Sequence, residues 1–278
     1  MNVRRRTLPT GWYPGTAKEC EREILHFLQG FELPEGKWNA GVAPHAGWGF
    51  SGRASAKVAK TLSSGGSVER VVIFGGHLPG GYDPIAYMED AWDTPFGPQD
   101  LDADLTYRLV NEGHASPVER GFSDNTIEIQ LPMVRYFFPG SKVIAVHSPS
   151  SERAIELARN VKGLLDEKKL KSVFIGSADL THYGPNYGFV PKGTGAASLR
   201  WVKEENDRTL IEKAINMEAL DLIKEARIRQ NTCSAGPIAS IIEVARLCGS
   251  SIGRLLDYYT SYDILPGPSF VGYAAIVY

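Results

Sequence analysis

Four short apolar runs separated by helical patterns constrain the fold of this chain most strongly. They are WNAGVAP, ERVVIFGG, SKVIAVHS and KSVFIGSA, which begin at residues 38, 69, 141 and 171. Each run is rich in small or β-branched apolar residues and is closed by Gly, Pro or Ser, as is typical of strands buried on both faces. Their composition therefore predicts a sheet with layers packed against both of its sides.

Helical patterns lie between these strands. The clearest cover residues 17–30, 151–169 and 235–249, and Gly249 is placed to end the last of them. Alternating strands and helices predict an α/β fold, a three-layer domain with a mostly parallel central sheet. Residues 253–263 and 269–278 read as two further strands. No repeat or long Pro/Gly/Ser linker divides the chain, so we expect a single domain over residues 1–278.

Composition excludes several classes of protein. With 278 residues, 43% of them hydrophobic, the chain can bury a sizeable core, and a net charge of -2 gives no broad basic surface for nucleic acid or anionic lipid. No run approaches the roughly 20 apolar residues that span a bilayer, and no apolar signal core follows the leading arginines. Three widely spaced cysteines argue for reduced thiols rather than a disulfide framework. We expect a cytoplasmic protein without a membrane or nucleic-acid partner.

Four of the six histidines follow the carboxyl ends of predicted strands. They are His45, His77, His147 and His182. Ligands of open α/β sheets bind outside these strand ends, so the four rings are candidates for a metal or acid-base centre. Any one ring, taken alone, is better explained as a partly buried histidine bonded to backbone, but the four rings together weaken that explanation. His26 and His114 have no such setting and are expected to be structural.

Cys233 stands immediately before the last predicted helix, in NTCSAGPI. The free amide groups and dipole at a helix N-terminus favour a thiolate, which is a good metal ligand. The alternative is a buried cysteine that behaves as a small apolar residue. Cys20 and Cys248 fall within predicted helices and fit this second description better.

Two carboxylates have competing interpretations. In SADLTHYG, Asp179 is three residues before His182, so the two side chains can form a general acid-base pair; alternatively, Ser177 or Asp179 caps a helix whose first turn holds His182. Glu128 forms an Asn125-x-x-Glu128 pattern, and here we favour a capping box that opens a helix. Residues 184–195, rich in Gly and Pro, predict an exposed loop at the rim of a site.

The motifs together resemble those of the Memo family, the protein B of a bacterial and archaeal trio that also contains an AMMECR-like protein and a radical S-adenosylmethionine protein. The resemblance rests on segments that start at the residue given: GWYPG (11), PHAGWGFSG (44), FGGHLPG (74), WDTPFG (92), NTIEIQLP (125), SADLTHYG (177), CSAGPI (233) and SFVGYAAIVY (269). These segments extend over nearly the whole chain. The family commonly has histidines around the positions of Asn125 and Gln130, and this chain has neither.

The resemblance implies a fold like that of class III extradiol dioxygenases, which hold non-haem Fe(II) with two histidines and one carboxylate. By motif, His45 and His77 match the two histidine ligands and Cys233 takes the place of the third. His182 matches the second-sphere acid-base histidine, with Asp179 beside it. Fe(II) is the expected cofactor by resemblance, and the softer thiolate also admits copper or zinc.

Three functions follow as expectations from this ligand set. The first is an oxygen-dependent, dioxygenase-like oxidation of an unidentified small molecule, with His182 and Asp179 moving protons. The second is a non-catalytic metal-binding or scaffold protein, since eukaryotic relatives have signalling roles. The third is zinc-assisted hydrolysis. The resemblance also implies a functional link to the AMMECR-like and radical S-adenosylmethionine proteins.

Overall fold

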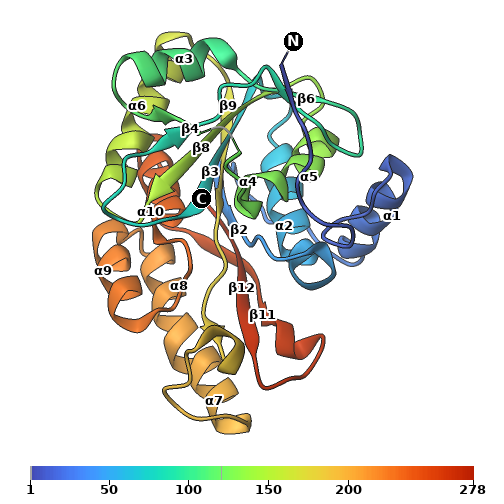
Figure 1. Cartoon of the computed structure of the whole chain (residues 1–278), viewed down its shortest axis with the longest axis vertical. Helices are drawn as coiled ribbons and strands as arrows, with labels where there is room; N and C mark the ends of the chain where they lie inside the picture. Colours follow the sequence, from blue (N-terminus) through green and yellow to red (C-terminus); the bar gives the residue numbers. More distant parts are fainter. Residues whose placement is uncertain (1, 120) are drawn as a thin grey trace.

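A central sheet with helices on both faces organises the computed structural model, which describes residues 2–119 and 121–278 (Figure 1). Its middle strands pair in parallel in the order β2 (Ala40–Ala43), β9 (Ser172–Ser177), β3 (Arg70–Leu78) and β8 (Lys142–Pro149). These are the four strands that the apolar runs predict. The predicted three-layer α/β architecture is therefore confirmed.

The sheet becomes mixed toward its two edges. Next to β2 lies antiparallel β12 (Phe270–Val277), which also pairs with β11 (Arg254–Thr260) and β10 (His182–Tyr183). At the other edge β4 (Ile85–Ala86) is antiparallel to β8 and parallel to β7 (Ser116–Pro117). A separate small sheet contains β1 (Val3–Arg4), β5 (Ala91–Trp92) and β6 (Gln99–Asp100). The two strands predicted near the C-terminus are thus β11 and β12, paired as antiparallel neighbours.

Side chains that alternate along the middle strands divide the core in two. On β3, Val72 and Phe74 pack with α3 (Ala103–Asn111), α6 (Arg153–Glu167), α8 (Asp207–Ile215), α9 (Ala219–Arg229) and α10 (Ala235–Leu247). Val71 and Ile73 point to the opposite face, toward α1 (Ala17–Phe27), α2 (Trp48–Ser63) and α5 (Leu131–Phe137). Figure 1 shows these two helical layers on either side of the strands. Successive side chains of a strand point to opposite faces of the sheet, and both sets are buried here because a layer of apolar helix faces covers each side.

Short elements complete the chain. They are α4 (Asn125–Glu128), α7 (Ala196–Trp201), the 3₁₀ turns η1 (Pro185–Tyr187) and η3 (Ser261–Asp263), and the π-helix η2 (Val202–Asn206). Gly249, at a φ of 94°, follows the end of α10 as predicted. Within the described ranges, no helix combines the length and apolar character needed to cross a membrane.

The capping box predicted at Asn125-x-x-Glu128 is wrong. Asp124 caps α4 instead, since its side chain accepts a hydrogen bond from the Thr126 amide at 2.8 Å. Glu128 is buried and turns to the N-terminal segment, where it accepts hydrogen bonds from the amides of Thr7 and Leu8 and from the Tyr13 hydroxyl. A buried carboxylate needs such donors, and this tertiary partner outcompetes the local helix end.

Candidate metal centre

Three predicted ligands meet at the carboxyl ends of the middle strands. His45 follows β2, His77 lies near the end of β3, and Cys233 precedes α10. One ligand atom from each residue lies within 4.8 Å of the other two, and this group can hold a metal ion. The rings of His45 and His77 stand nearly perpendicular, with centroids 4.9 Å apart. The sheet therefore brings together residues up to 188 positions apart.

A local irregularity of β3 directs His77 toward the centre. The pairing of β3 with β8 shifts between Gly75 and Leu78, and His77 has a positive φ of 61°. Few residues other than glycine adopt this left-handed backbone, and such strain is concentrated at functional sites. The His77 ring is 37% exposed, and Asp124 Oδ2 holds its Nδ1 at 2.8 Å. Nε2 is thereby left to face the other ligands.

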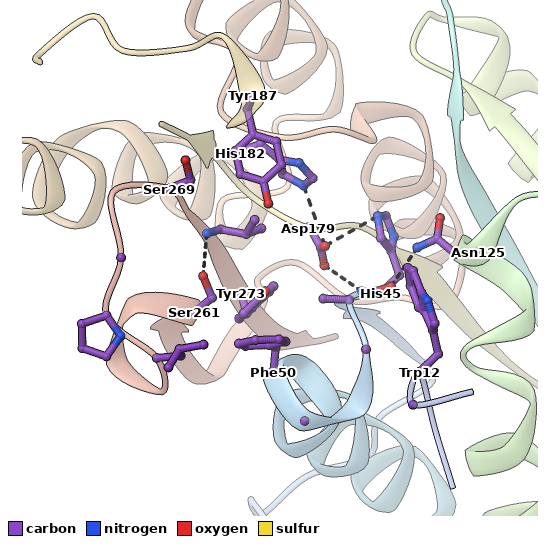
Figure 2. Close-up of a pocket in the computed structure, with 18 of the residues that line it drawn as sticks. Trp12, His45, Phe50, Asn125, Asp179, His182, Tyr187, Ser261, Ser269 and Tyr273 are labelled. Carbon is purple, nitrogen blue, oxygen red and sulfur yellow. Dashed lines mark hydrogen bonds and ion pairs between the residues drawn. The ribbon is translucent and has the colours of Figure 1, made fainter. Parts of the chain in front are cut away.

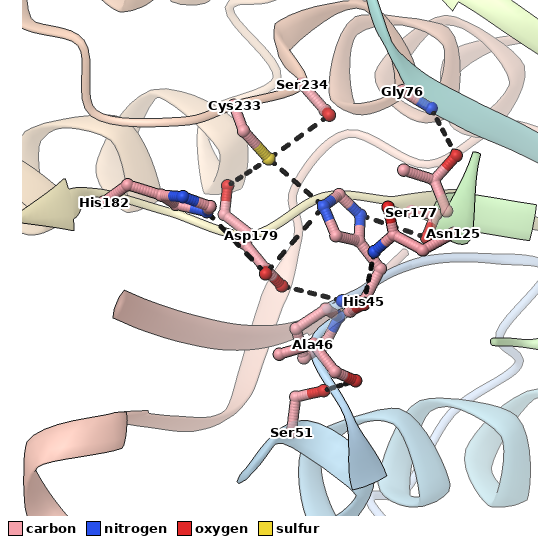
Figure 3. Close-up of polar contacts among 12 residues, drawn as sticks. His45, Ala46, Ser51, Gly76, Asn125, Ser177, Asp179, His182, Cys233 and Ser234 are labelled. Carbon is pink, nitrogen blue, oxygen red and sulfur yellow. Dashed lines mark hydrogen bonds and ion pairs between the residues drawn. The ribbon is translucent and has the colours of Figure 1, made fainter. Parts of the chain in front are cut away.

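His45 is fixed by its backbone as well as by its ring. Its amide donates to Asp179 Oδ1 at 2.7 Å, and its carbonyl accepts from the Asn125 side chain at 2.9 Å. The ring is buried, with Nδ1 3.3 Å from Ser177 Oγ and Nε2 3.2 Å from Cys233 Sγ (Figure 3). These contacts orient Nε2 toward the thiol.

Close packing of β3 against the start of α10 places Cys233. Gly76 has no side chain, and a β-carbon at this position would overlap Ser234 Oγ. Ser234 is the N-cap of α10, and its hydroxyl accepts from the His77 amide at 3.3 Å and also contacts Cys233 Sγ at 3.3 Å. A glycine on the strand is required for this approach. Cys233 therefore lies against His77 and His45 rather than in the apolar core.

Asp179 lies between buried His45 and the partly exposed His182. Its Oδ2 is 3.8 Å from Nε2 of both His45 and His182. The alternative in which Ser177 or Asp179 caps a helix is wrong, because residues 182–183 form β10 and Ser177 ends β9. His182 Nε2 is buried and lacks a hydrogen-bond partner among the described residues. The Asp179 carboxylate at 3.8 Å offsets part of the cost of burying that nitrogen.

The charges of the cluster are strongly coupled. Burial by itself raises the pKa of the Cys233 thiol, but His45, His182 and His77 outweigh it and bring that pKa well below its usual range. Burial lowers the pKa of His77, but Asp124 and Cys233 outweigh it and raise that pKa to about 10. Burial likewise lowers the pKa of His182, but Asp179 and Cys233 raise it to about 10. The thiol and the imidazoles thus shift one another toward their charged forms.

A cavity of about 810 Å³ opens beside the centre (Figure 2). His45, His77, Asp179 and His182 line one part of it. Its other walls come from segments distant in sequence, and they include Trp12, Phe50, Tyr187, Val271 and Tyr273. Tyr187 belongs to the loop predicted at a rim, and its ring packs edge-on against His182 with centroids 4.9 Å apart. Polar groups meet at the centre, and aromatic side chains enclose the remaining space.

His147 is not part of the centre. It is fully buried in β8, where Nδ1 lies 2.9 Å from the Gly76 carbonyl and Nε2 lies 3.1 Å from the Tyr87 hydroxyl. Burial lowers its pKa, so it is held as a neutral ring. The bonded, structural interpretation is correct for this histidine.

Several supporting residues were not predicted from sequence. Asp124 orients His77, and the only signal for it was its position before a short helix. The amides at the two positions where the family commonly has histidines, Asn125 and Gln130, hold the backbone of the His45 loop through the carbonyls of His45 and Pro44. Trp12 and Tyr273 reach the cavity from the two ends of the chain, and no local pattern marks them.

Fold and site together define a class: a three-layer α/β protein with a His–His–Cys group at the carboxyl ends of its central strands. A family model described as Memo-like protein matches residues 4–277. The chain belongs to the Memo family. It is similar to MEMO1 family proteins of Methanococcoides burtonii (29% identity) and Thermococcus onnurineus (30%), in each case over 99% of both chains. It is also similar to one from Methanopyrus kandleri, at 31% identity over 96% of this chain and 95% of the relative.

A solved structure supports the fold. The crystal structure of an uncharacterized protein from Escherichia coli K12 superposes with a TM-score of 0.51 over 87% of this chain and 99% of that chain. The sequence identity is 12%, so the likeness concerns the architecture alone.

Proposed function

We propose that this Memo-family protein binds one metal ion through His45, His77 and Cys233 and uses it to oxidise a small molecule with dioxygen. The observation that carries the proposal is the grouping of three ligand atoms within 4.8 Å beside a cavity of about 810 Å³. Cavities of this size enclose small-molecule substrates. The fold class that the sequence motifs resemble, the extradiol dioxygenases, adds support for oxygen chemistry.

The residues present fit a metal ion. In both histidines Nδ1 has a partner, Ser177 Oγ for His45 and Asp124 for His77, which leaves each Nε2 available. Metal-bound histidines are ordinarily oriented in this way through their second nitrogen. Two imidazoles and a thiolate suit iron, copper or zinc, and we propose Fe(II) first on the family resemblance. Bound Fe(II) would supply open coordination positions for substrate and dioxygen.

His182 and Asp179 are the proposed proton-transfer groups. His182 lines the cavity, and its Nε2 makes no hydrogen bond to the described residues, so this nitrogen is available to exchange a proton with a substrate that reaches it. Asp179 Oδ2, 3.8 Å away, stabilises the imidazolium that forms when His182 takes a proton. Trp12, Phe50 and Tyr273 limit the water that reaches this pair.

Metal content of protein purified without oxygen tests the proposal. Wild type should retain close to one iron per chain, His45→Ala and Cys233→Ser should lose it, and His26→Ala on the surface of α1 should retain it. His182→Ala should keep the iron but lose oxygen consumption over a substrate panel, because it removes the proton-transfer group and no ligand.

Other results change or contradict the proposal. Zinc in place of iron, lost in the same two variants, would keep the site and favour metal-assisted hydrolysis. A wild-type protein that takes up no metal even after reconstitution would contradict the proposal and favour a scaffold that binds a partner. Oxygen consumption equal to the metal-free background with iron bound would contradict the oxidation step.

A further inference from the structure

A second cavity, of about 420 Å³, reaches the centre from another direction. Cys233 lines this cavity, whereas His45 and His77 line the larger one. His182 and Tyr187 line both, so this pair forms a wall that the two cavities share. The second cavity therefore reaches Cys233, which does not line the larger cavity.

Among the described residues, one arginine and no carboxylate side chain line the second cavity. Arg227, an exposed residue of α9, lines it and makes no ion pair or hydrogen bond through its side chain to another described residue. Arg229, two positions further on, is instead paired with Glu225 at 2.7 Å. Gln230 adds a neutral amide to the lining.

We infer that the second cavity binds a small carboxylate, which Arg227 pairs with and which reaches Cys233 separately from any occupant of the larger cavity. A guanidinium presents parallel N–H groups that match a carboxylate. An unpaired arginine at the entrance also raises the local concentration of anions. His182, which also lines the cavity, offers its imidazole as a second polar contact.

Alkylation of Cys233 by two matched reagents tests this inference. In each case the thiolate displaces iodide and forms a thioether, but iodoacetate carries a carboxylate and iodoacetamide does not. The full-length protein is treated with chelator, and peptide mass spectrometry reads the rate at Cys233, with Cys248 as an internal reference. The ratio of the two rates cancels the fraction of thiolate and isolates the preference for an anion. The metal-binding proposal is measured separately, so either can fail alone.

The inference predicts opposite effects for two substitutions. Arg227→Gln should lower the iodoacetate-to-iodoacetamide ratio at Cys233 roughly fivefold, the effect of one nearby charge in a solvated site, and Arg227→Glu should lower it further. Gln230→Lys should raise the ratio. The matched control Arg229→Gln should leave it unchanged. An unchanged ratio in Arg227→Glu, or an equal fall in Arg229→Gln, would overturn the inference.

Discussion

Replacing Glu128 by Gln should release the N-terminal segment from the wall of the larger cavity. The carboxylate accepts hydrogen bonds from four groups: the Thr7 amide and hydroxyl, the Leu8 amide and the Tyr13 hydroxyl. Trp12 lies within this segment, and its carbonyl accepts from the Trp48 amide at 2.7 Å. Glu128 therefore ties residues 7–13 to the body of the protein on the side where Trp12 lines the cavity.

The magnitude follows from the number of acceptors. A Gln side chain keeps the shape but replaces one accepting oxygen by an NH₂ group, so about two of the four donors lose their partner. Hydrogen bonds to a charged group contribute about 1.5–3 kcal/mol each, and water compensates part of the loss because Thr7 is exposed. We expect the local opening of residues 7–13 to become about 3 kcal/mol easier, a roughly 150-fold increase in amide exchange.

Native-state hydrogen exchange read by mass spectrometry measures this opening. Exchange should accelerate in peptides covering residues 7–13 and stay unchanged in those covering β3 and β9. Glu32→Gln, at an exposed position, is the matched control and should have no effect. Exchange of residues 7–13 at the wild-type rate in Glu128→Gln would refute the argument that this carboxylate holds the segment.

Two further predictions concern stability and the centre. Burial raises the pKa of Asp207 to about 7, so the folded state keeps a proton that the unfolded state releases near pH 4; stability should fall between about pH 4 and 7, by at most roughly 4 kcal/mol. Chemical denaturation across this range should show that decline in wild type, and a decline of equal size in Asp207→Asn would exclude Asp207 as its source. Gly76→Ala should push Ser234 and Cys233 away from β3, costing about 1–3 kcal/mol and most of the metal affinity. Gly81→Ala, with open space around it, is the control, and equal metal content in both variants would contradict this packing argument.

The middle of the fold was predictable because its signals are local. In a strand formed by a run such as ERVVIFGG, apolar side chains point to both faces. Only a strand covered on both sides removes all of these side chains from water. The placement of His45 and His77 after such strands followed from the same pattern, since the carboxyl ends of parallel strands share one edge. Cys233 was identified by its position before a helix and by the family motif around it.

Other features depend on partners that no local pattern specifies. The Asn125-x-x-Glu128 spacing is that of a capping box, yet Glu128 binds residues about 120 positions away, because a buried carboxylate takes the best donors the fold provides. His147 has the same sequence setting as His77, but a regular strand buries it while a bulge and a positive φ turn His77 outward. Sequence alone thus determined the layers and the edge at which ligands gather. Tertiary structure decided which side chains meet there, because contacts between distant segments outweigh weak local preferences.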